Sequence, residues 1–304
     1  VGYQALDAED TGDFNTAVGY QALTTQNVDG TVGNSAFGHT AGSGLTTATH
    51  CVAVGYNSMG AHTSGGSNTA VGAGSMGDTD HGDCGTSVHN TFIGTNAGGG
   101  TWANNDCNYN TAVGSNPMIG NMDGALYNVS LGYNSLADLV SADYNVALGS
   151  NSASNLTTGA SNVAIGQGAL FTPTTAASNV VIGQESMADI QAGQAITGCV
   201  AVGFEAIKGS GSTTTGIDGS VAVGNQALKA LTTGTGNTAI GYTAMAGTIT
   251  GNSNVAIGYG ACADMGDTFG HNNVFIGKDA AGGTWTTDQS DNNVAIGYQS
   301  MKAA

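Results

Sequence analysis

The side chains that could do chemistry are few and scattered in this sequence. Six histidines stand singly, and the eighteen aspartates and three glutamates are dispersed through loops. General acid–base catalysis needs a positioned pair of titratable groups, and glycoside hydrolysis needs two facing carboxylates. The sequence also lacks a Gly-x-Ser-x-Gly elbow, a Walker loop and a His-Glu-x-x-His motif. We therefore expect no enzymatic activity.

Two acidic stretches have carboxylates at a spacing suited to calcium, because Asp side chains supply the hard oxygen ligands that Ca²⁺ prefers. One stretch runs from Asp7 to Asp13, and the other contains Asp78, Asp80 and Asp83. Neither matches an EF-hand loop or the Gly-Gly-x-Gly-x-Asp nonapeptide. Asp78, Asp80 and Asp83 are the candidate metal ligands, with a solvated acidic loop as the alternative. No other cofactor is expected.

The five cysteines fall into two groups. Cys51, Cys199 and Cys262 occupy positions of the repeat described below where we expect buried, structural thiols. Cys84 and Cys107 lie instead in two successive long insertions. Neighbouring loops in a stack could bring these two into disulfide range, and an oxidising compartment would preserve the bond. Cys84 and Cys107 are therefore a candidate disulfide.

Aromatic residues offer two further candidate sites. The phrase from Phe92 to Trp102 recurs from Phe275 to Trp285, and it contains both tryptophans. Phe and Trp in each phrase either pack on each other or leave Trp102 and Trp285 as platforms for a sugar ring. Tyrosine also follows one repeated glycine directly, and this stripe is either a receptor surface or a cross-strand ladder. Its members are Tyr3, Tyr20, Tyr56, Tyr133, Tyr242, Tyr259 and Tyr298.

A repeat of about seventeen residues positions all of these side chains. The phrase Asn-Thr-Ala-Val-Gly at residues 15–19 returns along the chain, and its glycine occurs in 17 copies, eight of the 16 intervals being 17 residues. Such a period is typical of a solenoid. The residues before the glycine alternate as in a strand, and the glycine marks a bend. We expect one coil per copy and a single domain over residues 1–304.

Two positions of the repeat predict how the coils stack. Asn stands four residues before the glycine in 13 of 16 copies, and we expect its side-chain amides to form an internal ladder from coil to coil. Three residues after the glycine, 16 of 17 copies carry Ala or Ser. That position is therefore expected to be crowded.

The strand is apolar on both faces, which predicts partner subunits. Ala stands two residues before the glycine in 12 of 16 copies, and we assign it to the outward face, where another backbone could approach closely. A closed homotrimer would bury this strip. The strip is represented by Ala17, Ala70, Ala164, Ala239 and Ala256.

The repeat wording, as in Asn-Val-Ala-Ile-Gly-Tyr-Gly-Ala at 254–261, resembles the head repeats of trimeric autotransporter adhesins of the YadA type. The resemblance covers nearly all of the chain and implies a left-handed parallel β-roll that trimerises and binds host surfaces. Coils of that family are shorter, near 14 residues. The phrase Asn-Thr-Ala-Val-Gly-Tyr-Gln-Ala-Leu at 15–23 looks more like repeats of bacteriophage tail-fibre proteins, in which a self-cleaving chaperone domain often follows.

Composition narrows the partners. The chain has four Lys, no Arg and a net charge of −17, so nucleic acid and anionic membranes are poor partners. No apolar run approaches the length of a membrane span. We expect an all-β parallel β-solenoid of about 17 coils, assembled as a homotrimeric rod that serves as an extracellular or virion fibre and attaches to a cell-surface glycan or protein receptor. Phage tail fibre is favoured; the alternatives are a bacterial surface adhesin and a glycan- or ice-binding solenoid.

Overall fold

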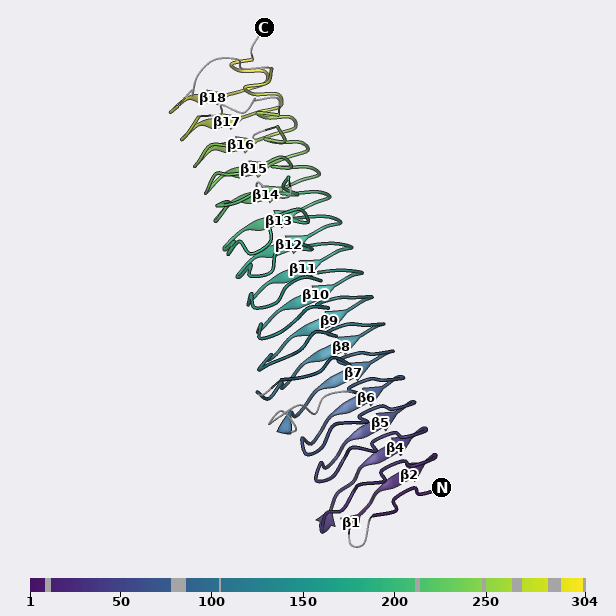
Figure 1. Ribbon diagram of the computed structural model, residues 1–304. Coiled ribbons are helices and arrows are strands. Elements are labelled where there is room, and N and C mark those ends of the chain that lie inside the picture. Colours follow the sequence, from purple (N-terminus) through teal and green to yellow (C-terminus); the bar gives the residue numbers. More distant parts are fainter. Residues whose placement is uncertain are drawn as a thin grey trace. The chain divides into compact units, whose positions relative to one another are not determined.

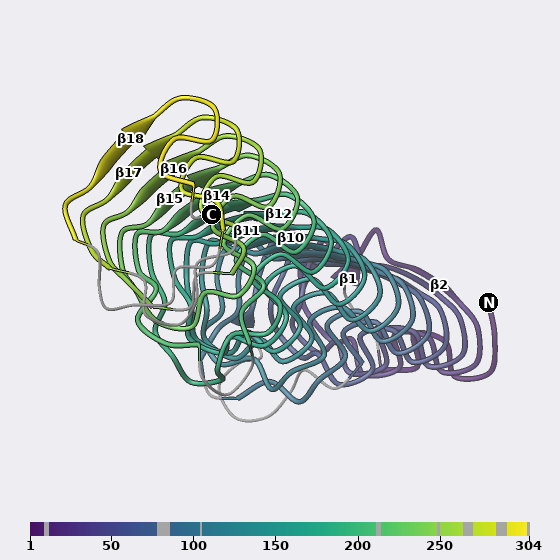
Figure 2. The same cartoon turned by 90° about the horizontal axis from the view of Figure 1, so that it is seen from above.

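The computed structural model describes residues 1–8, 12–77, 86–103, 105–210, 214–247, 250–263, 270–283 and 291–302. The chain divides into two compact units, Val1–Thr158 (unit 1) and Gly159–Ala304 (unit 2). In each unit one short strand per coil pairs with the strand of the next coil, and the rest of the coil returns through turns (Figures 1 and 2). None of the described residues lies in an α-helix. The predicted all-β parallel β-solenoid is confirmed.

Unit 1 contains one eight-stranded parallel ladder. Each strand pairs in register with the next, so that Thr69, Ala70 and Val71 lie beside Thr91, Phe92 and Ile93. A second, short parallel pair joins β1 (Gly12–Asp13) to β3 (Gly30–Thr31). The ladder consists of β2 (Thr16–Val18), β4 (Ser35–Phe37), β5 (Val52–Val54), β6 (Thr69–Val71), β7 (Thr91–Ile93), β8 (Thr111–Val113), β9 (Val129–Leu131) and β10 (Val146–Leu148).

Unit 2 repeats the same construction. Its strands also pair in parallel and in register, for example Val221 with Thr238, Ala222 with Ala239 and Val223 with Ile240. Constant register keeps equivalent side chains of successive coils in columns. The ladder consists of β11 (Val163–Ile165), β12 (Val180–Ile182), β13 (Val200–Val202), β14 (Val221–Val223), β15 (Thr238–Ile240), β16 (Val255–Ile257), β17 (Val274–Ile276) and β18 (Val294–Ile296).

The motif glycine is required at the end of each strand. Gly166 has a φ of 132°, and a Cβ there would lie 2.6 Å from the carbonyl carbon and oxygen of Gly183 in the next coil. Both the backbone angle and the close approach of the next coil exclude a side chain. The residues two and four positions later also have positive φ, as at Gln21 (53°) and Leu23 (51°), so the chain turns back sharply.

The core of each coil lies between the strand and the turn after the glycine. The central strand residue, the Ala or Ser three residues after the glycine, and a Leu, Met or Ile four residues after it are buried, as at Ala70, Ser75 and Met76. A larger side chain at the middle position would have no room. The predicted crowding at the Ala and Ser position agrees with this burial.

The predicted asparagine ladder is present. The Oδ1 atom of Asn110 accepts hydrogen bonds from the backbone N–H and the Nδ2 of Asn128, both at 3.0 Å, and its own Nδ2 donates to Ala125 O at 2.8 Å. Each amide therefore joins its own corner to the corner and return loop of the next coil. Where Cys51 replaces Asn, its Sγ donates to Gly65 O at 3.4 Å, which keeps one of these contacts.

Candidate interaction surfaces

The assignment of the two strand faces from sequence is wrong. Ala17 is 7% exposed, and Ala70, Ala164, Ala239 and Ala256 are 0 or 1% exposed within a single chain. The alanine strip therefore lies inside the coil, where the turn after the glycine packs against it. Because both faces of the strand are apolar, periodicity alone could not separate interior from exterior.

The first and third residues of each strand form the outward face instead. In unit 2 fifteen of these sixteen positions are Val or Ile, with Thr238 the exception; we call this surface the unit 2 strand face. Val180 and Val223 are each 37% exposed and Ile240 is 39% exposed. At ~4.8 Å per strand and ~10 Å of width, eight strands give an apolar patch on the order of 400 Å². The largest apolar patch of a typical monomeric protein is of about this size, and such patches often mark an interaction site.

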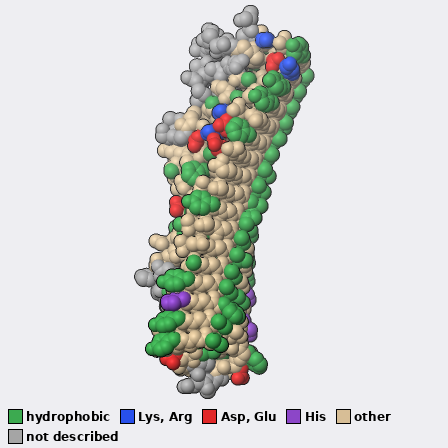
Figure 3. Space-filling view, turned by 90° about the vertical axis from the view of Figure 1, so that its right-hand side faces the viewer, with side chains coloured by type: hydrophobic (Ala, Val, Ile, Leu, Met, Phe, Trp, Pro, Cys, Tyr) green, Lys and Arg blue, Asp and Glu red, His purple; other side chains and the backbone are tan. Residues whose placement is uncertain are grey.

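The outward strand face of unit 1 contains more polar residues than the unit 2 strand face. Thr16, Ser35, Thr69, Thr91 and Thr111 stand at the first strand position, among valines. The third position remains apolar, and Phe37 and Leu131 are 43% and 49% exposed. Figure 3 shows hydrophobic side chains gathered in lines that run from coil to coil.

The predicted tyrosine stripe is exposed, and most of its members stack. In unit 1, Tyr3, Tyr20, His39 and Tyr56 form a column with ring centroids 5.4, 4.8 and 5.4 Å apart. Stacking covers the ring faces and leaves the ring edges to solvent. Tyr133 stands apart from this column, because the coils on either side carry Ser115 and Ser150 at its position.

In unit 2 the stripe includes a lysine. Tyr242 and Tyr259 stack at 5.0 Å, and the Nζ atom of Lys278 lies 5.5 Å from the Tyr259 ring and 6.0 Å from the Tyr298 ring. The ammonium group therefore takes the place of a ring in the column through cation–π contacts.

A second aromatic column was not expected from the sequence. His89, Tyr109, Tyr127 and Tyr144 stack with centroids 5.1, 4.8 and 5.2 Å apart. Each of these residues immediately precedes a ladder asparagine and has a φ of 58–60°. Aligning the copies on the asparagine would have revealed this column, because aromatics occupy the position in four successive coils.

An ion-pair cluster in unit 2 was also missed. The Nζ atom of Lys208 lies 2.7 Å from Glu185, 2.9 Å from Glu205 and 3.8 Å from Asp189, and Lys229 lies 2.6 Å from Glu205. Burial would raise the pKa of Glu205, but hydrogen bonds from Lys229, Lys208 and Gln226 outweigh it and lower that pKa to about 2. Hydrogen bonds to Glu185 and Glu205 raise the pKa of Lys208. Glu185 and Glu205 each stand two residues after the motif glycine in successive copies. This shared repeat position is the sequence feature that could have predicted the cluster.

The Trp102 platform is excluded. Trp102 is 0% exposed, packs edge-on against Phe92 with centroids 5.8 Å apart, and donates from Nε1 to Gly98 O at 3.2 Å. Of the two hypotheses for this phrase, packing of the two rings is the one observed. Trp285 lies outside the described residues.

The remaining candidate sites are only partly described. The candidate calcium ligands Asp78, Asp80 and Asp83 and the candidate disulfide partner Cys84 lie outside the described residues, whereas Cys107 is buried. No group of three His, Cys, Asp or Glu side chains suited to a metal occurs among the residues that are described. The three other cysteines are buried, as predicted, and burial raises the pKa values of Cys51 and Cys199 to about 11. Thiols with such pKa values are poor nucleophiles at neutral pH.

No protein-family model matches the chain, and no curated protein matches it. In the described ranges, no helix is long and apolar enough to cross a bilayer.

Proposed function

We propose that this chain is a structural and adhesive segment of an extracellular or virion fibre, in which three copies associate through their outward strand faces. The observation that carries the proposal is the unit 2 strand face, where fifteen of sixteen side chains are Val or Ile and several are more than a third exposed. Packing against another copy removes this apolar surface from water. A closed three-fold arrangement lets each copy contact both neighbours and leaves no open end to the interface.

Two further features support a fibre. Each coil contacts its neighbours through strand and asparagine ladders, so the fold extends by repetition. The exposed surface is rich in Tyr, Asn and Thr and almost free of cations, which suits attachment through polar and aromatic contacts. The repeat wording favours a phage tail fibre over a bacterial surface adhesin.

Ice binding is less well supported by the same surface. That activity needs a flat array of Thr at constant spacing, and Thr69, Thr91 and Thr111 do stand in register on the outward face of unit 1. The array is only three coils long, and the unit 2 strand face has Thr at residue 238 alone.

The proposal is tested by mass. Sedimentation velocity should give three times the chain mass for the parent. The double variant Ile240→Asp, Ile257→Asp should give a monomer with an unchanged circular dichroism spectrum, because the new carboxylates would be buried at the interface but solvated on a free chain. Asn225→Asp, at an exposed residue off this face, is the matched control and should remain trimeric. A monomeric or dimeric parent, or a trimeric double variant, would refute the model.

A further inference from the structure

One column of surface side chains in unit 2 is interrupted by two glycines, Gly168 and Gly260. The column is formed by residues two positions after the motif glycine, which include Thr243, Gly260, Asp279 and Gln299 in successive coils. Gly260 has a φ of 61° and carries no side chain, and a Cβ there would lie 2.7 Å from Oδ1 of Asp279. The Asp279 carboxylate therefore reaches into the space that a side chain at residue 260 would fill.

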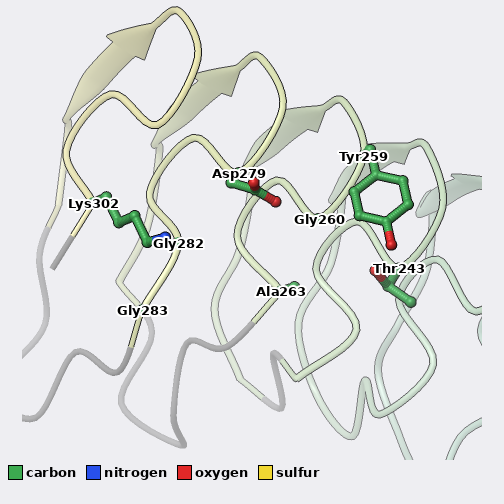
Figure 4. A pocket seen from close by; sticks show the side chains of 8 residues that line it. All are labelled: Thr243, Tyr259, Gly260, Ala263, Asp279, Gly282, Gly283 and Lys302. Atoms are coloured by element: carbon green, nitrogen blue, oxygen red, sulfur yellow. The ribbon is translucent and has the colours of Figure 1, made fainter. Parts of the chain in front are cut away.

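This gap is part of a cavity. Its volume is about 310 Å³, and Figure 4 shows the Tyr259 hydroxyl and Thr243 near one end, Lys302 near the other and Asp279 between them. The remaining lining residues are Gly260, Ala263, Gly282 and Gly283. Thr243 and Asp279 are two coils apart, which corresponds to ~9.6 Å along the stack. The cavity volume is large enough for a single six-membered ring.

The lining groups define the ligand chemistry. Asp279 accepts hydrogen bonds, Lys302 donates them, and the hydroxyls of Thr243 and Tyr259 do both. Both faces of the Tyr259 ring are occupied, by Tyr242 and Lys278, so its hydroxyl and ring edge are what remain for a ligand. Three glycines leave parts of the wall without side chains, so a ligand can approach the backbone.

We propose that this cavity binds a neutral hexose, free or as one residue of a glycan. A carboxylate accepts hydrogen bonds and an ammonium group donates them, and the hydroxyls of a neutral sugar can pair with both. An acidic or phosphorylated sugar is disfavoured, because Asp279 faces the ligand and the chain carries a net charge of −17. The site would give the proposed fibre a receptor class and rests on the proposed function for its biological use.

The test is ligand-observed NMR with the methyl glycosides of glucose, galactose, mannose, N-acetylglucosamine and N-acetylgalactosamine. One or more should show saturation transfer with a Kd in the millimolar range. Gly260→Asn should weaken binding at least tenfold, because the Asn side chain would enter the cavity and displace the Asp279 carboxylate. It should also fold, since Asn134 and Asn151 occupy the same repeat position with φ of 50° and 55°.

Gly74→Asn is the matched control. Gly74 stands at the same repeat position in unit 1 with a φ of 66°, and a Cβ there would lie 2.6 Å from Oδ1 of Asn96. It introduces the same side chain at a similar contact, so binding should stay within twofold of the parent. Asp279→Asn should also weaken binding, because it removes the charged acceptor.

Three outcomes would overturn the assignment: no glycoside binds, the Gly260→Asn variant binds like the parent, or the cavity binds glycine or alanine as zwitterions in preference to every sugar. The mass measurement of the fibre model uses no ligand. A parent protein that binds a glycoside but is not a trimer would therefore refute the fibre model alone, and a trimeric parent that binds no glycoside would refute the sugar site alone.

Discussion

Gly98 lies against the ring of Phe92, and a Cβ at residue 98 would be only 2.9 Å from ring carbons Cδ1 and Cε1. In most other coils these two positions hold a small residue in the strand and a large one in the turn, as with Ala70 and Met76, and the coil at Phe275 and Ala281 shares the exchange. The coil at Phe92 exchanges the two sizes and adds the Trp102 ring beside Phe92. Core volume is thereby kept similar although the strand residue changes from Ala to Phe.

This exchange predicts strong coupling between Phe92 and Gly98. Phe92→Ala should destabilise the protein by ~3–5 kcal/mol through the cavity it leaves. Gly98→Met should cost ~1–3 kcal/mol by overpacking. The double variant should cost at least ~1 kcal/mol less than the sum, because it recreates the pairing of Ala70 and Met76. Denaturant titration of the four proteins measures the coupling, and additive costs would show that the two side chains do not share one space.

The repeat made much of the fold predictable from sequence. A glycine that ends every strand, an asparagine four residues before it and a small residue three residues after it each have one structural explanation, and the structure contains all three features. These positions are informative because each accepts few residue types. The reason is the positive φ at Gly166, the buried hydrogen bonds at Asn110 and the close packing at Ala169.

The inside and outside of the strand were not predictable in the same way. Ala239 and its neighbours Thr238 and Ile240 are all compatible with either face of a sheet. The turn after the glycine determines which strand face points inward. Met245, four residues after the glycine, is buried there and requires a small residue such as Ala239 opposite it. The Glu205 cluster was missed for a different reason, since Glu185, Glu205 and Lys229 are separated by about one coil length and become neighbours only in the stack.

The asparagine ladder predicts a large cost for removing one member. Asn110→Ala should destabilise the protein by ~2–5 kcal/mol, because it removes the acceptor of the buried Asn128 backbone N–H, one of three acceptors of the Asn128 amide and the amide donor to the Ala125 carbonyl. Asn225→Ala, at an exposed position, should change stability by less than ~0.5 kcal/mol. Thermal unfolding of both variants checks this, and equal melting temperatures would show that the ladder does not contribute to stability.

The Glu205 cluster predicts acid sensitivity. The pKa of Glu205 is about 2 in the folded chain, below its ordinary value of 4.5, so its ionised form stabilises the fold above pH 4.5. That contribution is lost as the pH falls from about 4.5 to 2. Glu205→Gln should therefore destabilise the protein at pH 7 and show a smaller further loss than the parent between pH 5 and pH 3. Urea midpoints at the three pH values measure this.

Asp138→Asn is the control for the acid series, because Asp138 is an exposed carboxylate. Its stability profile should parallel that of the parent across the same pH range. If Glu205→Gln and Asp138→Asn gave the same profile, the lysines around Glu205 would have no net effect on the fold.

The close packing of the Ala or Ser three residues after the motif glycine predicts that a larger residue there will cause local unfolding of its coil. Ala169 is 0% exposed, so Ala169→Leu should overpack its coil and cost ~1–3 kcal/mol. Because a solenoid is stabilised mainly by contacts between neighbouring coils, amides of β11 and the paired β12 should lose hydrogen-exchange protection, while those of β15 should keep it. Gln167→Leu adds a similar side chain at an exposed position two residues away and should leave all three strands protected. Unchanged protection of β11 in Ala169→Leu would mean that the site has room for Leu, whereas equal loss at β15 would mean that unit 2 opens as one cooperative block.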